Sequence, residues 1–270
     1  MFFPAGFYYK TFMWPPSFWY KIYEPFIRMA AGFGEASIKH DKERYEHKYE
    51  YCDLLVTGSG PSGLASAYAA AKNGARVILA EDKPRYGGSL LTSDVNIGNQ
   101  TGVEWSEKII AELKSMSNVT VKNRSQVFGY YDHNMLVMSE RISDHLPKTQ
   151  KYLPKQRLWY IRANEVLISS GSIERPLVFG NNDTPGVMLS SAAKEYMKVY
   201  GVLVGKKPLI FTNNDSGYET AIEFKKNGVN PLILDTRKEP SSDIINEAKN
   251  LNIEIKFSHV VVAAKGYKKV

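Results

Sequence analysis

Three glycines and one acidic residue within residues 52–90 have the spacing of a dinucleotide-binding turn. Gly58, Gly60 and Gly63 form a Gly-x-Gly-x-x-Gly sequence directly after an apolar run. In such a turn the first glycine allows the bend, the second lets the backbone approach a pyrophosphate, and the third lets the next helix pack closely. Glu81 follows about 20 residues later, where a carboxylate accepts hydroxyl protons of an adenosine ribose. These residues therefore predict non-covalent binding of a dinucleotide.

The elements that must position these residues are a strand, a helix and a second strand. Apolar runs predict strands over residues 52–57 and 76–80, and the alanine-rich stretch between them predicts a helix over 61–73 that ends at Gly74. The free N–H groups and the positive dipole end of that helix would point at the phosphates. The order strand, turn, helix, strand predicts a Rossmann-like parallel sheet in an α/β protein.

A second glycine pair narrows the fold class. Gly87 and Gly88 follow the acid, as is typical of the glutathione-reductase-like two-dinucleotide-binding fold, in which a second helix begins at this point and also faces the pyrophosphate. The later segment LISSGSIERP is similar to the one that closes over the bound dinucleotide in that class, with Ser169 and Ser170 preceding Gly171. We therefore predict this fold, with a second α/β unit that is truncated.

These segments together predict which dinucleotide is bound and which residues contact it. The carboxylate of Glu81 would repel a 2′-phosphate, and Lys83 and Arg85 lie close enough in sequence to soften that repulsion, so NADP is disfavoured rather than excluded. The residues that we expect to contact the dinucleotide are Gly58, Gly60, Pro61, Ser62, Gly63, Glu81, Asp82, Gly87, Gly88, Ser89, Val127 and Gly171.

The rest of the chain repeats the pattern on a smaller scale. Residues 103–116 form an amphipathic helix, alternation around Asp132 to Asn134 predicts a hairpin, and residues 156–171 suggest two further strands. After Pro185 a second series of helix, strand, turn, helix and strand begins, and the chain stops in a strand-like pattern near Val260 to Val262. We expect a piece of a longer protein with three parts: an aromatic lead-in over 1–50, a dinucleotide-binding domain over 51–190 and an incomplete α/β domain over 191–270.

The second strand–turn–helix sequence, IFTNNDSGYETA, differs from the first at the positions that matter for binding. Phosphate-binding glycines would stand where this chain has Asn213, Asn214, Asp215 and Ser216, and Asp215 would repel a pyrophosphate. The simpler interpretation is that Asp215 or Ser216 is the N-cap of the following helix.

Composition excludes several other functions. The net charge of +7 comes from scattered lysines and arginines rather than a basic stripe, so we expect no nucleic acid partner. Cys52 is the single cysteine, lies at the start of a predicted buried strand, and fits an inert thiol in a reducing cytoplasm. The five histidines are dispersed, so no catalytic or metal-binding group is predicted, and no apolar run is long enough for a membrane span.

Four segments together resemble the alpha subunit of heterotetrameric sarcosine oxidase: PAGFYYKTFMWP, GSGPSGLASAYAAAKNGARVILAED, SGSIERPLVFGNNDTPGVMLSSA and FTNNDSGYETA. The likeness runs from Pro4 to the last residue. Related subunits of amino-acid and opine dehydrogenases share the dinucleotide motifs, whereas the aromatic lead-in points to sarcosine oxidase.

The resemblance implies that this region binds NAD, with FAD as the alternative at the same site. It also implies beta, gamma and delta subunits as partners, with FMN near the alpha–beta interface and FAD in the beta subunit. Sarcosine would be oxidised on the beta subunit to glycine, a one-carbon unit and hydrogen peroxide. The alternatives from the residues are an FAD-binding subunit of an amino-acid or opine dehydrogenase and a non-catalytic nucleotide-binding scaffold.

Overall fold

The structure is a computed structural model that describes residues 14–32, 34, 37–147, 152–266 and 270. Its internal contacts divide the chain into two compact units, Met1–Glu43 and Arg44–Val270. The first unit contains a π-helical turn, η1 (Trp19–Tyr23), which continues into α2 (Glu24–Ala30). Trp14, Tyr20 and Phe26 of the predicted aromatic lead-in are exposed, and residues 1–13 lie outside the described residues.

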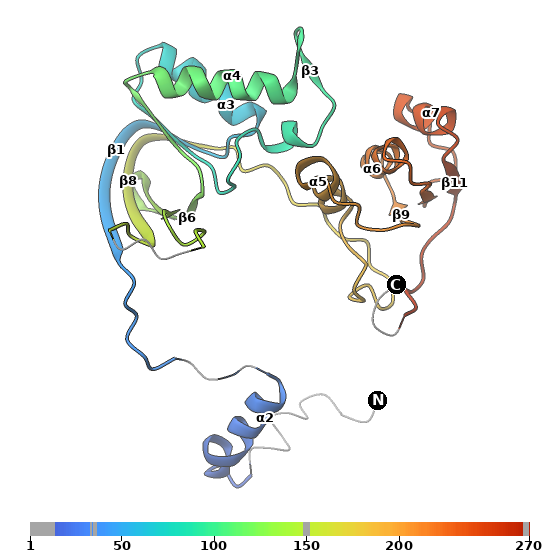
Figure 1. The fold of residues 1–270 in the computed structure, drawn as a ribbon, viewed down its shortest axis with the longest axis horizontal. Helices are drawn as coiled ribbons and strands as arrows, with labels where there is room; N and C mark the ends of the chain where they lie inside the picture. Colours follow the sequence, from blue (N-terminus) through green and yellow to red (C-terminus); the bar gives the residue numbers. More distant parts are fainter. Residues whose placement is uncertain (1–13, 33, 35–36, 148–151, 267–269) are drawn as a thin grey trace. The chain divides into compact units, whose positions relative to one another are not determined.

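The second unit is built on a six-stranded sheet in the order β5-β2-β1-β8-β7-β6 (Figure 1). The first four of these strands run parallel, as predicted, and the last two add an antiparallel meander. The turn between β6 and β7 is η3 (Asp132–Asn134), so the predicted hairpin is confirmed. The strands are β1 (Tyr45–Thr57), β2 (Val77–Ala80), β5 (Val119–Lys122), β6 (Ser125–Tyr131), β7 (Met135–Arg141) and β8 (Gln156–Ile168).

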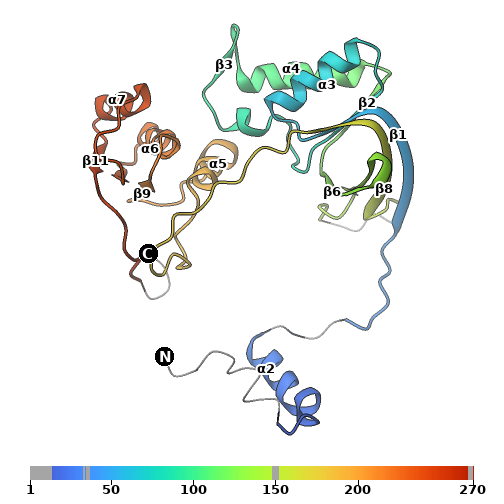
Figure 2. The same ribbon diagram turned by 180° about the vertical axis from the view of Figure 1, so that it is seen from behind.

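Alternate residues of β1 and β2 face two different cores. Val56 and Leu79 pack against helices α3 (Pro61–Lys72) and α4 (Gly102–Ser115), whereas Leu55 and Ile78 pack against the meander. Burial of each large apolar side chain stabilises the fold by about 1.5–3 kcal/mol. Figure 2 shows both helices on one side of β1 and β2, with β6 and β8 curling round the other side. The strand that leads into the glycine turn is therefore held from both faces.

The helices have local reasons to form where they do. The small side chains of Ala67 and Ala71 let α3 approach the sheet, and they are buried. α4 begins with a capping box, in which Thr101 Oγ1 accepts from the Glu104 N–H at 3.2 Å and the Glu104 carboxylate accepts from the Thr101 N–H at 2.8 Å. A short hairpin of β3 (Asn96–Ile97) and β4 (Gln100–Thr101) precedes it.

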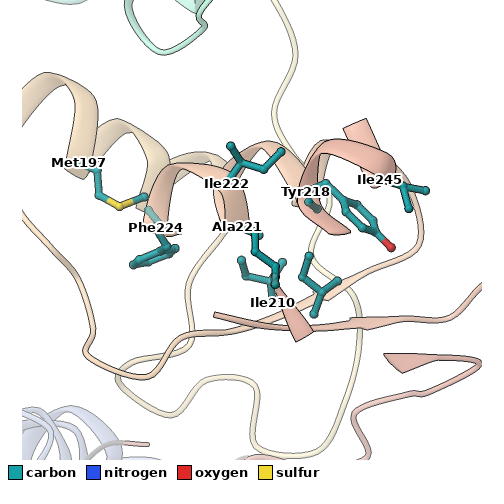
Figure 3. Close-up of a cluster of buried hydrophobic side chains, with 11 residues drawn as sticks. Met197, Ile210, Tyr218, Ala221, Ile222, Phe224 and Ile245 are labelled. Atoms are coloured by element: carbon teal, nitrogen blue, oxygen red, sulfur yellow. The ribbon is translucent and has the colours of Figure 1, made fainter. Parts of the chain in front are cut away.

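The smaller α/β part has a parallel three-stranded sheet in the order β11-β10-β9. Met197, Ile210, Tyr218, Phe224 and Ile245 meet in its core, between the strands and the helices (Figure 3). Its elements are α5 (Ser190–Tyr200), β9 (Leu209–Thr212), α6 (Ser216–Lys226), β10 (Leu232–Asp235), α7 (Asp243–Asn250) and β11 (Glu254–Phe257).

Four expectations about elements were wrong. β1 begins at Tyr45 rather than at residue 52, because residues 45–52 pair with β8. Residues 156–168 form one strand instead of two. No second helix begins at Gly88; a 3-10 turn, η2 (Gly88–Leu91), stands there. Residues 260–262 are not a strand edge, since the only pairing nearby is the single bridge of Gly180 with Ala263 among the described residues.

Candidate dinucleotide-binding site

Two of the three glycines in the turn after β1 are required by close carbonyl groups. Gly58 has φ +99°, and a Cβ placed on it would lie 2.4 Å from the Ser169 carbonyl oxygen. A Cβ on Gly63 would lie 2.0 Å from the Gly58 carbonyl oxygen. The Ser169 hydroxyl donates to the carbonyl oxygens of Thr57 and Gly58, at 2.9 and 3.0 Å. The end of β8 therefore fixes the turn, a role of Ser169 that the sequence pattern did not reveal.

Gly60 differs from these two glycines, because no neighbouring protein atom requires a glycine at this position. Its φ and ψ of −67° and −178° suit any residue, and an added Cβ would meet no heavy atom within 4 Å. It is also the N-cap of α3, with Pro61 in the first turn and no side chain capping the helix. No side chain therefore caps the first turn of α3, and an uncapped helix N-terminus is the arrangement that binds a phosphate.

The Gly87–Gly88 pair packs against this turn. The Gly87 N–H donates to the Ser59 carbonyl oxygen at 3.1 Å, and Gly87 has φ +120°. A Cβ on Gly88 would lie 2.8 Å from Gly60 Cα. Two glycine-rich segments far apart in sequence are therefore in direct contact, and both are at the N-terminus of α3.

Glu81, at the end of β2, is turned toward the same place. Its side chain is buried, with the residue 6% exposed. Its Oε2 accepts from the Ser59 N–H at 2.9 Å and from the Ser59 hydroxyl, and its Oε1 accepts from the Lys83 N–H at 3.0 Å. The carboxylate thus holds the glycine turn in place, which the sequence did not predict. A carboxylate has about four acceptor positions, so these three hydrogen bonds leave roughly one, which an incoming hydroxyl would share with the neighbouring Asp82 side chain.

The protonation of Glu81 reflects this setting. Burial raises the pKa of the Glu81 carboxyl above its usual range, and a hydrogen bond with the Asp82 side chain raises it further. The hydrogen bonds from Ser59 and from the Lys83 backbone act in the opposite direction. A ligand hydroxyl that donates to Glu81 would also lower the pKa of its carboxyl, because such a hydrogen bond stabilises the ionised form.

The remaining predicted site residues lie around this centre. Val127 is half-buried in β6. The start of this strand lies at the end of β2, because the Ser125 N–H donates to the Glu81 carbonyl oxygen at 2.8 Å. Gly171 has φ +73° and open space about its Cβ position, just beyond Ser169. Four more predicted residues are exposed along the turn and the segment after β2: Pro61, Ser62, Asp82 and Ser89.

Known proteins share parts of this sequence and geometry. The sequence profile described as FAD dependent oxidoreductase matches residues 53–141, which contain the glycine turn, Glu81 and the start of the meander. The alpha subunit of the sarcosine oxidase of Rhizobium meliloti is 46% identical over 91% of this chain, and that of Corynebacterium sp. (strain P-1) is 35% identical over 86%. The chain is homologous to one segment of the sarcosine oxidase alpha subunits. It spans about a quarter of their length, namely 25% and 24%.

A more distant relative and two solved structures complete the comparison. An opine oxidase subunit from Agrobacterium tumefaciens is 28% identical and covers 71% of this chain and 38% of its own length. The L-proline dehydrogenase of P. horikoshii superposes with a TM-score of 0.58 at 21% identity, covering 77% of this chain and 40% of that one. The thioredoxin reductase of T. acidophilum gives 0.59 at 17% identity, covering 81% and 68%. These structures confirm the predicted fold class.

The matching profile is that of FAD-dependent oxidoreductases, which implies a dinucleotide cofactor, and the residues at the first turn fit one. Gly60 leaves room where a side chain would stand, the N-terminus of α3 carries no cap, and the Glu81 carboxylate retains acceptor capacity. A pyrophosphate and an adenosine ribose would satisfy these groups.

The second turn, between β9 and α6, does not fit a dinucleotide. Asn214 occupies the place of Gly60, and its Oδ1 accepts from the Ser216 N–H at 2.9 Å. Asp215 is at the N-cap position, as predicted, but its side chain does not cap α6 and instead pairs with Arg237 at 2.8 Å. Arg237 and the Tyr218 hydroxyl also bind Asp235, which is fully buried at the end of β10.

Other polar groups of the sequence contribute no second centre. Cys52 is buried, and burial raises the pKa of its thiol to about 11, so the thiolate is scarce at neutral pH. Within the described ranges, His, Cys, Asp and Glu side chains form no group of three or more that could hold a metal ion. No helix in the described part of the chain is both long enough and apolar enough to cross a membrane.

Proposed function

We propose that the turn at Gly58–Gly63 holds the ADP moiety of a dinucleotide. The observation that carries this proposal is the open space at Gly60 in front of an uncapped helix N-terminus, beside a buried acid at the end of the neighbouring strand. The backbone N–H groups of α3 would bind the pyrophosphate, and Glu81 would accept a ribose hydroxyl.

Two dinucleotides share this ADP moiety, and each has separate support. The resemblance to sarcosine oxidase alpha subunits implies NAD, whereas the matching family profile is that of FAD-dependent oxidoreductases. The native protein should be purified without added cofactor, its ligand released by denaturation and identified by mass spectrometry and absorbance. An FAD-loaded protein is yellow and an NAD-loaded one is not. Release of neither compound, combined with no binding of added ADP, would refute the site.

The wider function that we propose is that of a segment of the alpha subunit in a sarcosine oxidase-type complex. Homology over 91% of the chain supports this. Such a complex would demethylate sarcosine oxidatively to glycine and produce hydrogen peroxide, with the oxidation carried by a partner subunit and with beta, gamma and delta subunits as partners. The dinucleotide of this chain would then support the complex rather than react with the amine.

This wider proposal is testable in the assembled complex. The chain should be isolated together with its bound partners, and hydrogen peroxide formation should be measured with sarcosine. Peroxide formation that requires sarcosine would support the proposal, and its absence in a complete complex would contradict it. Turnover and assembly that are unchanged when the dinucleotide site is blocked would instead favour a scaffold without a cofactor role.

A second candidate function rests on the opine oxidase relatives. The matching opine oxidase subunits of Agrobacterium tumefaciens and Rhizobium meliloti are 28% and 26% identical to this chain. The chain would then be the dinucleotide-binding subunit of an opine or amino-acid oxidising complex. Offering the same complex an opine in place of sarcosine separates the two functions, since each predicts a different amine as electron donor.

A further inference from the structure

Helix α5 of the smaller α/β part has an apolar face and a separate polar stripe. Ala193 and Met197 are buried in the core of the smaller part, where Figure 3 shows Met197. Glu195 and Lys198 lie on another side of the helix, and Ser191 precedes Glu195 by one turn on that side. The apolar face therefore anchors α5 in its own core and leaves the polar stripe for contacts with other segments.

The first of these contacts is with the segment that follows β8. This segment begins at Ser169, whose hydroxyl holds the glycine turn, and continues through Gly171. The Glu174 carboxylate then accepts from the backbone N–H groups of Ser190 and Ser191, at 3.2 and 2.7 Å. Since the N-terminus of a helix attracts a carboxylate, Glu174 ties the start of α5 to a segment that borders the candidate site.

The second contact is an ion pair from the segment that follows β2. The Lys83 N–H donates to the Glu81 carboxylate at 3.0 Å, so the backbone of Lys83 is fixed beside the candidate ribose site. Its Nζ donates to Glu195 Oε1 at 2.7 Å. The two side chains are 50% and 31% exposed, and an exposed pair of this kind stabilises little on its own.

The third contact comes from the segment that follows η2. This turn starts at Gly88, which packs against the glycine turn, and Asp94 follows three residues after its end. Asp94 binds Lys198 of α5, and it binds Lys226 of α6 at 3.1 Å. Lys198 also binds Glu223 of α6 at 3.1 Å. Three segments that border the candidate site therefore reach one side of α5, at successive turns of the helix.

We propose that a dinucleotide bound at the glycine turn fixes α5, and through α5 the smaller α/β part, against the part that is built on the six-stranded sheet. This inference rests on the proposed function. A ligand that contacts the segments after β2 and β8 and the start of η2 restricts their motion, so their contacts with α5 then form at a lower cost in conformational entropy. The smaller part, whose own turn does not fit a dinucleotide, would thus respond to a ligand bound at the first turn.

Hydrogen exchange on the full chain, with and without saturating ADP, tests this coupling. ADP should slow the exchange of amides in α5 about fivefold or more, since coupling between two sites is typically at least of this size. Lys83→Glu and Glu195→Lys each turn the attractive pair into a repulsive one, which should reduce the slowing to about twofold or less. The double variant Lys83→Glu/Glu195→Lys pairs opposite charges again and should restore the slowing. Glu239→Lys makes the same change of charge at an exposed position outside α5 and is the matched control.

Calorimetric titration with ADP separates this inference from the proposed function. Glu195→Lys should still bind ADP and keep any general stabilisation by the ligand, so its loss of protection in α5 would report the broken contact. ADP binding without slower exchange in α5 would overturn the inference and leave the proposed function standing. Single variants that are protected as well as the native chain, or a double variant no better than the single ones, would also overturn it. A native chain that binds no ADP would refute the proposed function and this inference with it.

Discussion

Replacement of Gly60 by alanine separates the folding of the glycine turn from its binding. Gly60 has backbone angles that alanine adopts without strain, and the added methyl group meets no atom within 4 Å. The folded protein should therefore change in stability by less than about 1 kcal/mol, because the gain of about 0.4–1 kcal/mol from restricting the unfolded chain is offset by alanine being a poorer N-cap than glycine. The same methyl group projects into the space in front of α3, where the pyrophosphate would lie.

The binding loss can be worked out from the contacts that the methyl group displaces. A hydrogen bond from a backbone N–H to a charged group contributes about 1.5–3 kcal/mol. Loss of two such bonds costs about 3–6 kcal/mol, which corresponds to roughly a hundredfold to ten-thousandfold weaker binding at about 1.4 kcal/mol per factor of ten. Gly60→Val should abolish binding.

Calorimetric titration with ADP, NAD and FAD measures this loss, and chemical unfolding measures the stability. Gly205→Ala is the matched control, since Gly205 also has open space about its Cβ position and no positive φ. Unchanged affinity in a folded Gly60→Ala variant would refute the pyrophosphate assignment. Strong destabilisation would instead refute the claim that the position is open.

Three further predictions concern the same turn. Glu81→Ala should weaken dinucleotide binding by about 1–3 kcal/mol in calorimetry, and Glu81→Gln should weaken it less, because the amide keeps one acceptor for Ser59; equal affinity in all three proteins would contradict the assignment. The pKa of the Glu81 carboxyl is raised in the folded protein, so protonation of Glu81 should weaken ligand binding as the pH falls through that pKa. In the ligand-free protein, the unfolding free energy should decrease as the pH rises from 4.5 through the raised pKa, because the folded state holds the proton more tightly. Both trends should be absent from Glu81→Gln. Gly63→Ala should destabilise the fold by more than about 1 kcal/mol in chemical unfolding, since its Cβ would lie 2.0 Å from the Gly58 carbonyl oxygen, and native stability would show that the turn can relax.

The sequence predicted those parts of the site that depend on local backbone rules. The spacing of Gly58, Gly60 and Gly63 is set by a single turn and its helix, so it can be recognised in the sequence without knowledge of any tertiary contact. Ser59 and Ser169 were not predicted as anchors, because each acts through a residue from a different strand, Glu81 in one case and Thr57 in the other. A serine beside a glycine turn or at a strand end carries no distinctive signal on its own.

The errors in the strands have a similar origin. Residues 45–51 do alternate aromatic and charged side chains, which is a strand pattern, but neither face is apolar enough to predict burial. In β8 the sequence Ala163, Asn164 and Glu165 looks like a break, yet the strand continues because β1 pairs with it from Gln156 to Ile168. β7 pairs only with the first part of β8, up to Arg162. The valines at 260–262 favour a strand, but among the described residues the only pairing nearby is the bridge of Gly180 with Ala263.

The two strand–turn–helix units differ at the position that we expect to decide whether such a turn binds a dinucleotide. Gly63 and Gly217 are equivalent, since each lets its helix approach the preceding strand, and Glu81 and Asp235 follow them at the same separation. Gly60 of the first turn corresponds to Asn214 of the second turn. With glycine at this position, the N-terminus of α3 has no side-chain cap.

At the second turn the polar groups satisfy one another. Asp235 accepts from the Tyr218 hydroxyl at 2.7 Å, from the Arg237 N–H at 2.9 Å and from the Arg237 guanidinium at 2.8 Å. Its acceptor positions are therefore occupied, whereas Glu81 keeps one. A ligand at the second turn would have to break the ion pair between Arg237 and the buried carboxylate of Asp235. We therefore expect a nucleotide to bind at the first turn, where Glu81 keeps an acceptor position and α3 has no side-chain cap. At the second turn the hydrogen bonds of Asp235 are already made to Tyr218 and Arg237.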